Sequence, residues 1–188
     1  MKSAVREIVI IVVLTFIFFI GIRAVVHNFE VKGRSMEPTL HNGQYIIVSK
    51  ASYWFGDPQR GDIVVFDTVK FNHGIIHRIV GLPGELVEIK KGTLCINDQE
   101  VRETYIQGNA VTSSRKIVPD NSYFIVGDNR QAASSDIVKR ENIIGKAWLS
   151  YWPISEWGLA PNYSWDLSGN SGKEVRVESV KLAPASSM

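Results

Sequence analysis

The chain has 188 residues, of which 45% are hydrophobic and 21% are charged, an ordinary composition for a globular protein. Its formal net charge is only +2, and no stretch concentrates Lys and Arg with aromatic residues between them, which argues against a nucleic-acid-binding protein. The single cysteine, Cys95, excludes an intrachain disulfide and a cysteine-based zinc site.

The N-terminal segment is apolar and carries no charge from residue 8 to residue 22. The apolar span reaches Val26 if the charge of Arg23 extends toward the membrane interface. About 20 apolar residues suffice for a helix to cross a bilayer. A buried core helix would show a polar face and a cleaved signal peptide would end in small residues, and this segment does neither. We therefore expect residues 1–27 to form an uncleaved membrane anchor, whose orientation is left open by basic residues on both sides.

Residues 28–160 alternate short apolar runs with turn signals. The runs, such as QYIIVSK and SYFIVGD, are rich in Val, Ile and aromatic residues, which favour strands. Between them stand Asn42-Gly43 and Asn97-Asp98, which favour turns. The pattern predicts a mainly β domain of antiparallel sheets, packed together or coiled into a barrel.

The stretch GRSMEPTL places Ser35 in a loop that begins with glycine. Gly33 allows the backbone to come close to another group, Pro38 stiffens the chain, and Met36 offers an adaptable apolar side chain. A serine nucleophile also needs a base within hydrogen-bond reach and donors for the developing oxyanion. On these residues alone, Ser35 is either a turn residue or a nucleophile.

The same stretch resembles the nucleophile box of type I signal peptidases, membrane-bound serine proteases that remove signal peptides. Four later stretches resemble further boxes of that family in the same order: RGDIVVF, HRIVGLPGE, GDNR with SSD, and IIGKAWLSYWPISEWG. The resemblance extends from the anchor to about Trp157. Several boxes in one order behind an N-terminal anchor are far more specific than any single motif.

The resemblance implies coiled antiparallel sheets with a smaller β appendage around residues 85–120. It implies Ser35 as the nucleophile, with its own N–H as an oxyanion donor and Gly33 in support. Met36 and Pro38 are then candidate substrate contacts. The resemblance also implies a catalytic domain on the outer face of the cytoplasmic membrane, acting on preproteins with small residues, typically alanine, before the cleaved bond.

His77 stands where most bacterial members of that family carry the general-base lysine. We favour His77 as the base, because a neutral imidazole with an ordinary pKa of about 6.5 needs no burial to accept a proton. A Ser–His pair also resembles the eukaryotic and archaeal branch of the superfamily. Two other interpretations stay open: His77 is too short to reach Ser35, or it is an ordinary strand residue. His27, His41 and His73 lie outside the base box.

The last box departs from the family pattern as well. Ser134 and Asp136 best match its Ser-x-Asp pair, with Ser135 as the alternative serine. In the family this serine bonds to the base and the aspartate pairs with an arginine, for which Arg130 is the candidate here. The second arginine of the family pattern is missing, unless Arg140 substitutes for it.

Arg78 and Asp128 are further candidates for supporting residues. Either Asp128 or Asp136 is expected to orient His77 in a triad-like set. Asp128 is equally consistent with a turn residue after the strand YFIV.

We therefore predict a single-pass membrane serine endopeptidase that removes signal peptides. Its expected partners are preprotein signal peptides and the lipid bilayer, with no nucleic acid, metal or cofactor, and we expect a monomer. Of two aromatic clusters, at residues 53–55 and 152–157, one is expected at the membrane–water interface. Residues 161–188 are expected to form a C-terminal extension that is flexible in part, with a linker at 168–172.

Two alternatives remain at this level. The protein is a catalytically weak or inactive homologue acting in secretion or surface-protein assembly, or it is a protease dedicated to one substrate.

Overall fold

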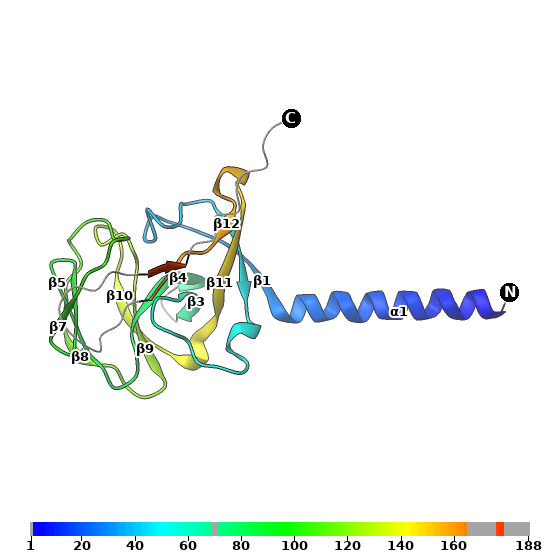
Figure 1. Cartoon of the computed structure of the whole chain (residues 1–188), viewed down its shortest axis with the longest axis horizontal. Helices are drawn as coiled ribbons and strands as arrows, with labels where there is room; N and C mark the ends of the chain where they lie inside the picture. Colours follow the sequence, from blue (N-terminus) through cyan, green and yellow to red (C-terminus); the bar gives the residue numbers. More distant parts are fainter. Residues whose placement is uncertain (1, 69–70, 165–175, 179–188) are drawn as a thin grey trace.

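A computed structural model of the chain describes residues 2–68, 71–164 and 176–178. The first element is α1 (Lys2–Val25), which projects away from the β domain in Figure 1. Within it, Val5–Val25 is a 21-residue apolar stretch of which nothing is buried against the rest of the protein. At about 1.5 Å per residue, such a stretch matches the roughly 30 Å hydrocarbon core of a bilayer. The N-terminal apolar helix that the sequence predicts is confirmed.

The larger sheet is antiparallel and runs in the order β1-β2-β11-β3-β4-β9-β10, with β12 paired to β11. Its path ends at β1 and β10, so the mainly β prediction is confirmed but the sheet is not closed into a barrel. Its strands are β1 (Val26–Glu30), β2 (Tyr45–Ser49), β3 (Ile63–Thr68), β4 (Phe71–Gly81), β9 (Ser122–Val126), β10 (Ser135–Lys139), β11 (Ile143–Trp152) and β12 (Gly158–Leu159).

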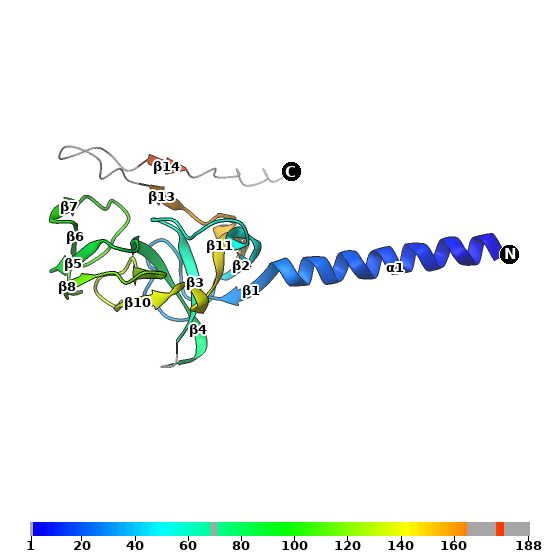
Figure 2. The same cartoon turned by 90° about the horizontal axis from the view of Figure 1, so that it is seen from below.

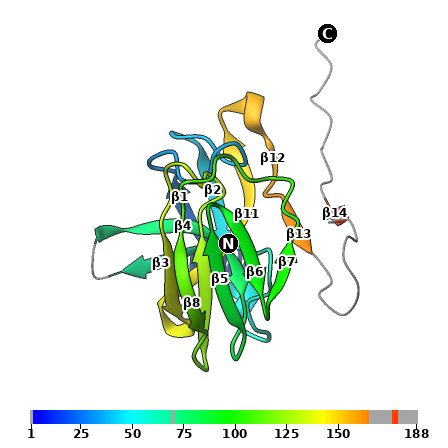
Figure 3. The same ribbon diagram turned by 90° about the vertical axis from the view of Figure 1, so that its left-hand side faces the viewer.

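The smaller sheet lies at the end of the domain opposite α1, as Figure 2 shows, and its order is β7-β6-β5-β8. Figure 3 shows these strands side by side, seen from that end. Two two-residue hairpins connect them, Lys91-Gly92 and Asn97-Asp98, and every one of these residues has a positive φ. Such backbone values define the type I′ turn, which matches the twist of a hairpin. The strands are β5 (Leu86–Lys90), β6 (Thr93–Ile96), β7 (Gln99–Val101) and β8 (Ser113–Ile117).

The core consists of three clusters of buried apolar side chains. One lies within the larger sheet and includes Met36, Ile63 and Ile76. A second fills the space between the sheets and includes Phe124 of β9 and Ile89 of the smaller sheet. The third contains β-strand residues on the other face of β3 and β4. Burial of each such side chain contributes roughly 1.5–3 kcal/mol to the stability of the fold. Because clusters pack on both faces of β4, this strand is fixed from both sides.

Short elements complete the domain and extend beyond it. A two-stranded sheet pairs β13 (Asn162–Ser164) with β14 (Arg176–Glu178). The expected linker at residues 168–172 lies outside the described residues. The described residues also include the single-turn 3-10 helices η1 (Ala51–Tyr53), η2 (Arg140–Asn142) and η3 (Ile154–Glu156).

Candidate active site

Ser35 lies in residues 31–44, the connection from β1 to β2, called the nucleophile loop below. The N–H of Val31 donates to the carbonyl oxygen of Gln44 at 2.8 Å, which closes the base of the loop. The N–H of Gly33 donates to Oδ1 of Asn42 at 2.8 Å. Gly33 has a φ of 91°, a left-handed conformation that favours glycine. The glycine two residues before Ser35 therefore sets the path of the loop.

Two apolar side chains anchor the loop from beneath. Met36 and Leu40 are 0% and 2% exposed and belong to the core cluster within the larger sheet. The N–H of Leu40 donates to the carbonyl oxygen of Met36 at 2.9 Å, forming one tight turn. Ser35 itself is half-buried, and Pro38 is exposed. Met36, a candidate substrate contact, is thus a core residue in this structure and fixes Ser35 from within.

Residues 127–130, which directly follow β9, form a support segment under the nucleophile loop. The N–H of Asn129 donates to the carbonyl oxygen of Ser35 at 2.9 Å, and its side-chain amide donates to the carbonyl oxygen of Arg34 at 2.9 Å. A Cβ atom on Gly127 would lie 2.3 Å from the Ser35 carbonyl oxygen. Only glycine therefore allows this close approach.

His77 lies in the middle of β4, where it pairs with Val64 of β3. The β4–β9 register pairs Arg78 with Val126, so Gly127 is the next residue alongside His77. Because Gly127 also packs against Ser35, the register brings the loop and the histidine to neighbouring positions. Within the described part of the chain, no hydrogen bond joins the Ser35 hydroxyl to the His77 ring.

The His77 ring is held in an apolar environment. The residue is 4% exposed, and its ring centroid lies 5.9 Å from that of Phe66. Burial lowers the pKa of His77 from 6.5 to about 4, while the charges of Asp128 and Asp136 oppose that shift. Its Nδ1 is buried and has no hydrogen-bond partner in the described part of the chain. His77 is therefore a neutral imidazole at pH 7, with one ring nitrogen unpaired.

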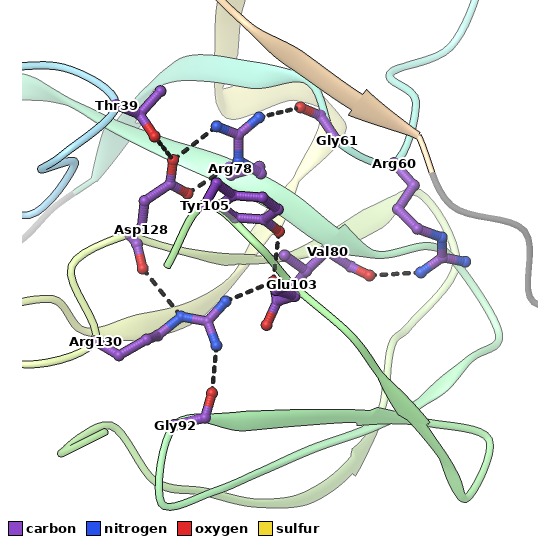
Figure 4. Close-up of polar contacts among 11 residues, drawn as sticks. Thr39, Arg60, Gly61, Arg78, Val80, Gly92, Glu103, Tyr105, Asp128 and Arg130 are labelled. Atoms are coloured by element: carbon purple, nitrogen blue, oxygen red, sulfur yellow. Dashed lines mark hydrogen bonds and ion pairs between the residues drawn. The ribbon is translucent and has the colours of Figure 1, made fainter. Parts of the chain in front are cut away.

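The next residue on β4, Arg78, points to the opposite face and forms a buried ion pair with Asp128. Its Nε and Nη2 donate to the two Asp128 carboxylate oxygens at 2.9 and 2.7 Å, and neither side chain is exposed. Burial alone would lower the pKa of Arg78, but the Asp128 charge and hydrogen bonds outweigh burial and raise it. Thr39 of the nucleophile loop donates to Asp128 Oδ2 at 2.6 Å (Figure 4). The Asp128 carboxylate thus bonds directly to Arg78 and Thr39, and it acts on His77 only through its charge.

Arg130 pairs with Glu103, and the expected pair with Asp136 is corrected by this finding. Its Nη2 donates to Glu103 Oε1 at 2.7 Å, and the two side chains are 0% and 1% exposed. The Arg130 guanidinium also donates to the carbonyl oxygen of Gly92, so it points toward the smaller sheet (Figure 4). The other candidate, Arg140, donates to the carbonyl oxygen of Tyr53 at 2.7 Å.

Asp136 lies on β10, whose register pairs it with Ile125. Ile125 in turn pairs with Ile79, two residues from His77, so strand alternation gives Asp136 and His77 the same face. Ser135 pairs with Val126 and faces the other way, with Arg78. Ser134, which precedes β10, is exposed. Of the two candidate serines, Ser135 is the less suited to meet His77.

The remaining histidines lie elsewhere. His27 is on β1 and His41 is in an exposed turn. His73 is exposed near the beginning of β4, on the same strand as His77.

Sequence reasoning missed several residues that hold the site. Thr39 and Asn129 stand inside the motifs that were singled out, yet their bonds depend on contacts between distant segments. Glu103 and Tyr105 follow β7 in a stretch with no motif, so nothing local identifies them. Among the described residues, no group of three or more His, Cys, Asp or Glu side chains is arranged to hold a metal ion.

The family model and the curated relatives agree on one family. A family model described as signal peptidase, peptidase S26, matches residues 2–152. A probable signal peptidase I-2 from Synechocystis is 37% identical over 76% of this chain and 71% of its own. A signal peptidase IB from Staphylococcus aureus is 30% identical over 83% of this chain and 94% of its own. A crystal structure of a signal peptidase I from Enterococcus faecalis covers 48% of this chain and 96% of its own, with 29% identity and a TM-score of 0.40.

Proposed function

The chain belongs to the signal peptidase (peptidase S26) family, and from this membership we propose that it is a membrane-bound serine endopeptidase that removes N-terminal signal peptides. We assign Ser35 as the nucleophile and His77 as the base. One observation carries this assignment: the nucleophile loop rests on Gly127 and Asn129, beside a buried and neutral His77. A neutral imidazole next to a serine loop is the combination that nucleophilic acyl transfer needs.

In the proposed reaction, the Ser35 oxygen attacks the scissile carbonyl carbon as His77 accepts the hydroxyl proton. The carbonyl oxygen becomes an oxyanion, to which the Ser35 N–H donates. When the C–N bond breaks, His77 returns the proton to the leaving amine. Water then attacks the acyl-serine, with His77 again accepting a proton, and the protonated imidazole returns it to Ser35.

The environment of His77 acts on the proton transfer in two opposite ways. Burial keeps the imidazole neutral at pH 7, which leaves a ring nitrogen free to accept a proton, but the lowered pKa also makes it a weaker base. The charges of Asp128 and Asp136 favour the imidazolium that forms during attack. No bond joins Ser35 and His77 in the described residues, so we propose that the contact forms when substrate fills the site, as catalytic hydrogen bonds often tighten in the complex.

We further propose that α1 anchors the enzyme in the cytoplasmic membrane as a single pass, with the catalytic domain on the extracytoplasmic side as a monomer. Large exposed aromatic side chains on two loops support close contact with the bilayer. Trp54 and Phe55 follow η1 and are 56% and 99% exposed, while Trp152 and Trp157 flank η3 and are 53% and 52% exposed. Both loops lie on the α1 side of the domain in Figure 1, and such side chains suit the membrane–water interface.

The division of the chain that we propose follows from these roles. Residues 1–27 are the anchor, residues 28–160 are the catalytic domain, and residues 161–188 are an extension. The smaller sheet, around residues 85–120, is an appendage of the catalytic domain.

The test uses the purified full chain in detergent with a preprotein that has alanine before the cleavage site. The parent chain is expected to release the signal peptide, and Ser35→Ala is expected to release none. The matched control is Ser114→Ala, which alters an exposed serine of the smaller sheet and is expected to cleave at the parent rate. An inactive homologue would leave the preprotein intact with all three proteins, and a protease dedicated to one substrate would cleave only selected preproteins.

A further inference from the structure

We infer that Glu103 and Tyr105 are positioning residues that hold the support segment, residues 127–130, beneath Ser35. The inference rests on the proposed function, and it adds two residues that lie outside the family's boxes. It also gives the smaller β appendage a role in the reaction, because both residues come from the connection between β7 and β8.

Arg130 joins the support segment to the appendage through its guanidinium. All three of its nitrogen groups are bonded inside the protein: Nη2 to Glu103, Nη1 to the carbonyl oxygen of Gly92 at 2.6 Å, and Nε to the carbonyl oxygen of Gly127 at 3.2 Å. Glu103 and Gly92 belong to the appendage, whereas Gly127 begins the support segment. Arg130 therefore fixes the support segment to the appendage.

Tyr105 contacts both buried ion pairs of this region. Its hydroxyl donates to Glu103 Oε1, and the Cζ of Arg78 lies 4.4 Å from the centre of its ring. Arg78 in turn holds Asp128. Figure 4 shows Tyr105 between the Arg78–Asp128 pair and the Arg130–Glu103 pair. Tyr105 thus links the Arg78–Asp128 pair to the Arg130–Glu103 pair.

The Arg78–Asp128 and Arg130–Glu103 pairs hold the residues that flank Asn129. Asp128 and Arg130 stand on either side of Asn129, whose N–H donates to the carbonyl oxygen of Ser35 at 2.9 Å. The main chain after Tyr105 also runs beside this segment: Gln107 N–H donates to the carbonyl oxygen of Asp128 at 2.9 Å, and Gln107 and Asn129 form a parallel bridge. The hydrogen bond from Asn129 to the Ser35 carbonyl is therefore held in place by the ion pairs of both residues that flank Asn129. The adjacent main chain at Gln107 holds it as well.

The buried carboxylate of Glu103 is not needed for stability alone. Burial raises the pKa of Glu103 although Arg130 opposes the shift, and its Oε2 is buried without a partner among the described residues. A well-packed apolar pair is often at least as stable as a buried ion pair. A charged pair here instead gives directional bonds, which fix geometry. That property matters at a nucleophile, where a displacement of about 1 Å can reduce the rate roughly a hundredfold.

The test compares Glu103→Gln in the full chain with Glu100→Gln, a matched change of an exposed residue of β7. Glutamine keeps the size of Glu103 but removes the charge that faces Arg130. We expect kcat to fall about tenfold while KM changes less than about twofold, because the support under Ser35 loosens while the substrate surface persists. We also expect the Asn129 amide hydrogen to exchange faster, while core amides such as that of Val48 stay protected. Glu100→Gln is expected to match the parent in both measurements.

Each possible result either supports or overturns the positioning role of Glu103 and Tyr105. A kcat or an Asn129 exchange rate equal to the parent's overturns the inference, and so does faster exchange throughout the core, which shows a purely structural role. If Glu103→Gln does not fold, Tyr105→Phe is measured instead, since it removes only the hydroxyl, and an unchanged kcat and exchange rate then overturn the inference. If the parent cleaves no preprotein, the proposed function fails. The hydrogen exchange rate of the Asn129 amide in Glu103→Gln then decides alone whether Glu103 positions the support segment.

Discussion

The carbonyl oxygen of Ser35 accepts the backbone N–H of Asn129 at 2.9 Å, so the residue that carries the nucleophile rests on the segment that follows β9. This contact is possible because Gly127 has no side chain at the point of closest approach. The position of Ser35 therefore depends on distant parts of the chain that meet only in the folded protein.

Replacing Gly127 with alanine is expected to displace Ser35. The added Cβ would lie 2.3 Å from the Ser35 carbonyl oxygen and 2.6 Å from the Ala133 Cβ, so the nucleophile loop must shift. We expect kcat to fall at least about a hundredfold. The control is Gly56→Ala, where a Cβ would meet nothing within 4 Å and parent activity is expected. Steady-state cleavage of a preprotein measures both, and an active Gly127→Ala enzyme would contradict this account of the loop.

Replacing Asp128 with asparagine is expected to destabilise the whole domain. It leaves the fully buried Arg78 guanidinium without a counter-charge. Breaking a buried ion pair in this way typically costs about 3–5 kcal/mol. The exposed pair of Arg115 and Asp98 supplies the control, because Asp98→Asn should change the free energy of unfolding by less than about 1 kcal/mol. Urea unfolding of the two variants measures both free energies of unfolding. Equal losses of stability would refute the difference expected between the buried and the exposed ion pair.

Replacing His77 with alanine is expected to lower kcat by about 10²–10⁴-fold, the usual contribution of a general base. His41→Ala, which alters an exposed turn residue, is expected to cleave normally. Full activity of His77→Ala would refute the assigned base. His77→Lys is the companion variant: activity in this protein would show that the site retains a geometry in which an amine also reaches Ser35.

The pH dependence of stability should also report His77. Burial lowers the pKa of His77 from 6.5 to about 4, so between these values the unfolded chain binds more protons than the folded one. The contribution of neutral His77 to the free energy of unfolding is fully present above pH 6.5. It is lost as the pH falls toward 4, and the loss is about 3 kcal/mol. His77→Gln, which cannot titrate, is expected to lose less stability over that interval. Melting temperatures at pH 7 and pH 4.5 test this, and equal acid sensitivity in both proteins would argue against the buried neutral state.

Local chemistry explains which parts of this fold could be predicted. The turn at Asn97-Asp98 was predicted because those residues tolerate the positive φ that a tight hairpin requires. The apolar α1 was predicted from its length and lack of charge. These features depend on residues that are adjacent in the sequence, and no knowledge of the tertiary structure is needed to recognise them.

The partners within the site could not be predicted in the same way. The sequence suggests Asp136, which is close to Arg130 along the chain, whereas the actual partner of Arg130 is Glu103, from the connection between β7 and β8. The choice depends on which way the Arg130 side chain leaves the support segment, and that direction is set by tertiary packing. The low pKa of His77 likewise results from burial by Phe66 and its neighbours on the other strands.

The exposed aromatic residues lead to a last prediction, about contact with the bilayer. Phe55, in the loop after η1, is 99% exposed, whereas Ile117 is 67% exposed on β8 of the smaller sheet, which lies at the end of the domain opposite α1 (Figure 2). Each is replaced by tryptophan in the full chain, reconstituted into vesicles that contain brominated lipid. We expect the added fluorescence of Phe55→Trp to be quenched, because aromatic side chains of that loop lie in the interface. Ile117→Trp should stay bright, and equal quenching at both positions would mean that the domain does not face the membrane with its aromatic loops.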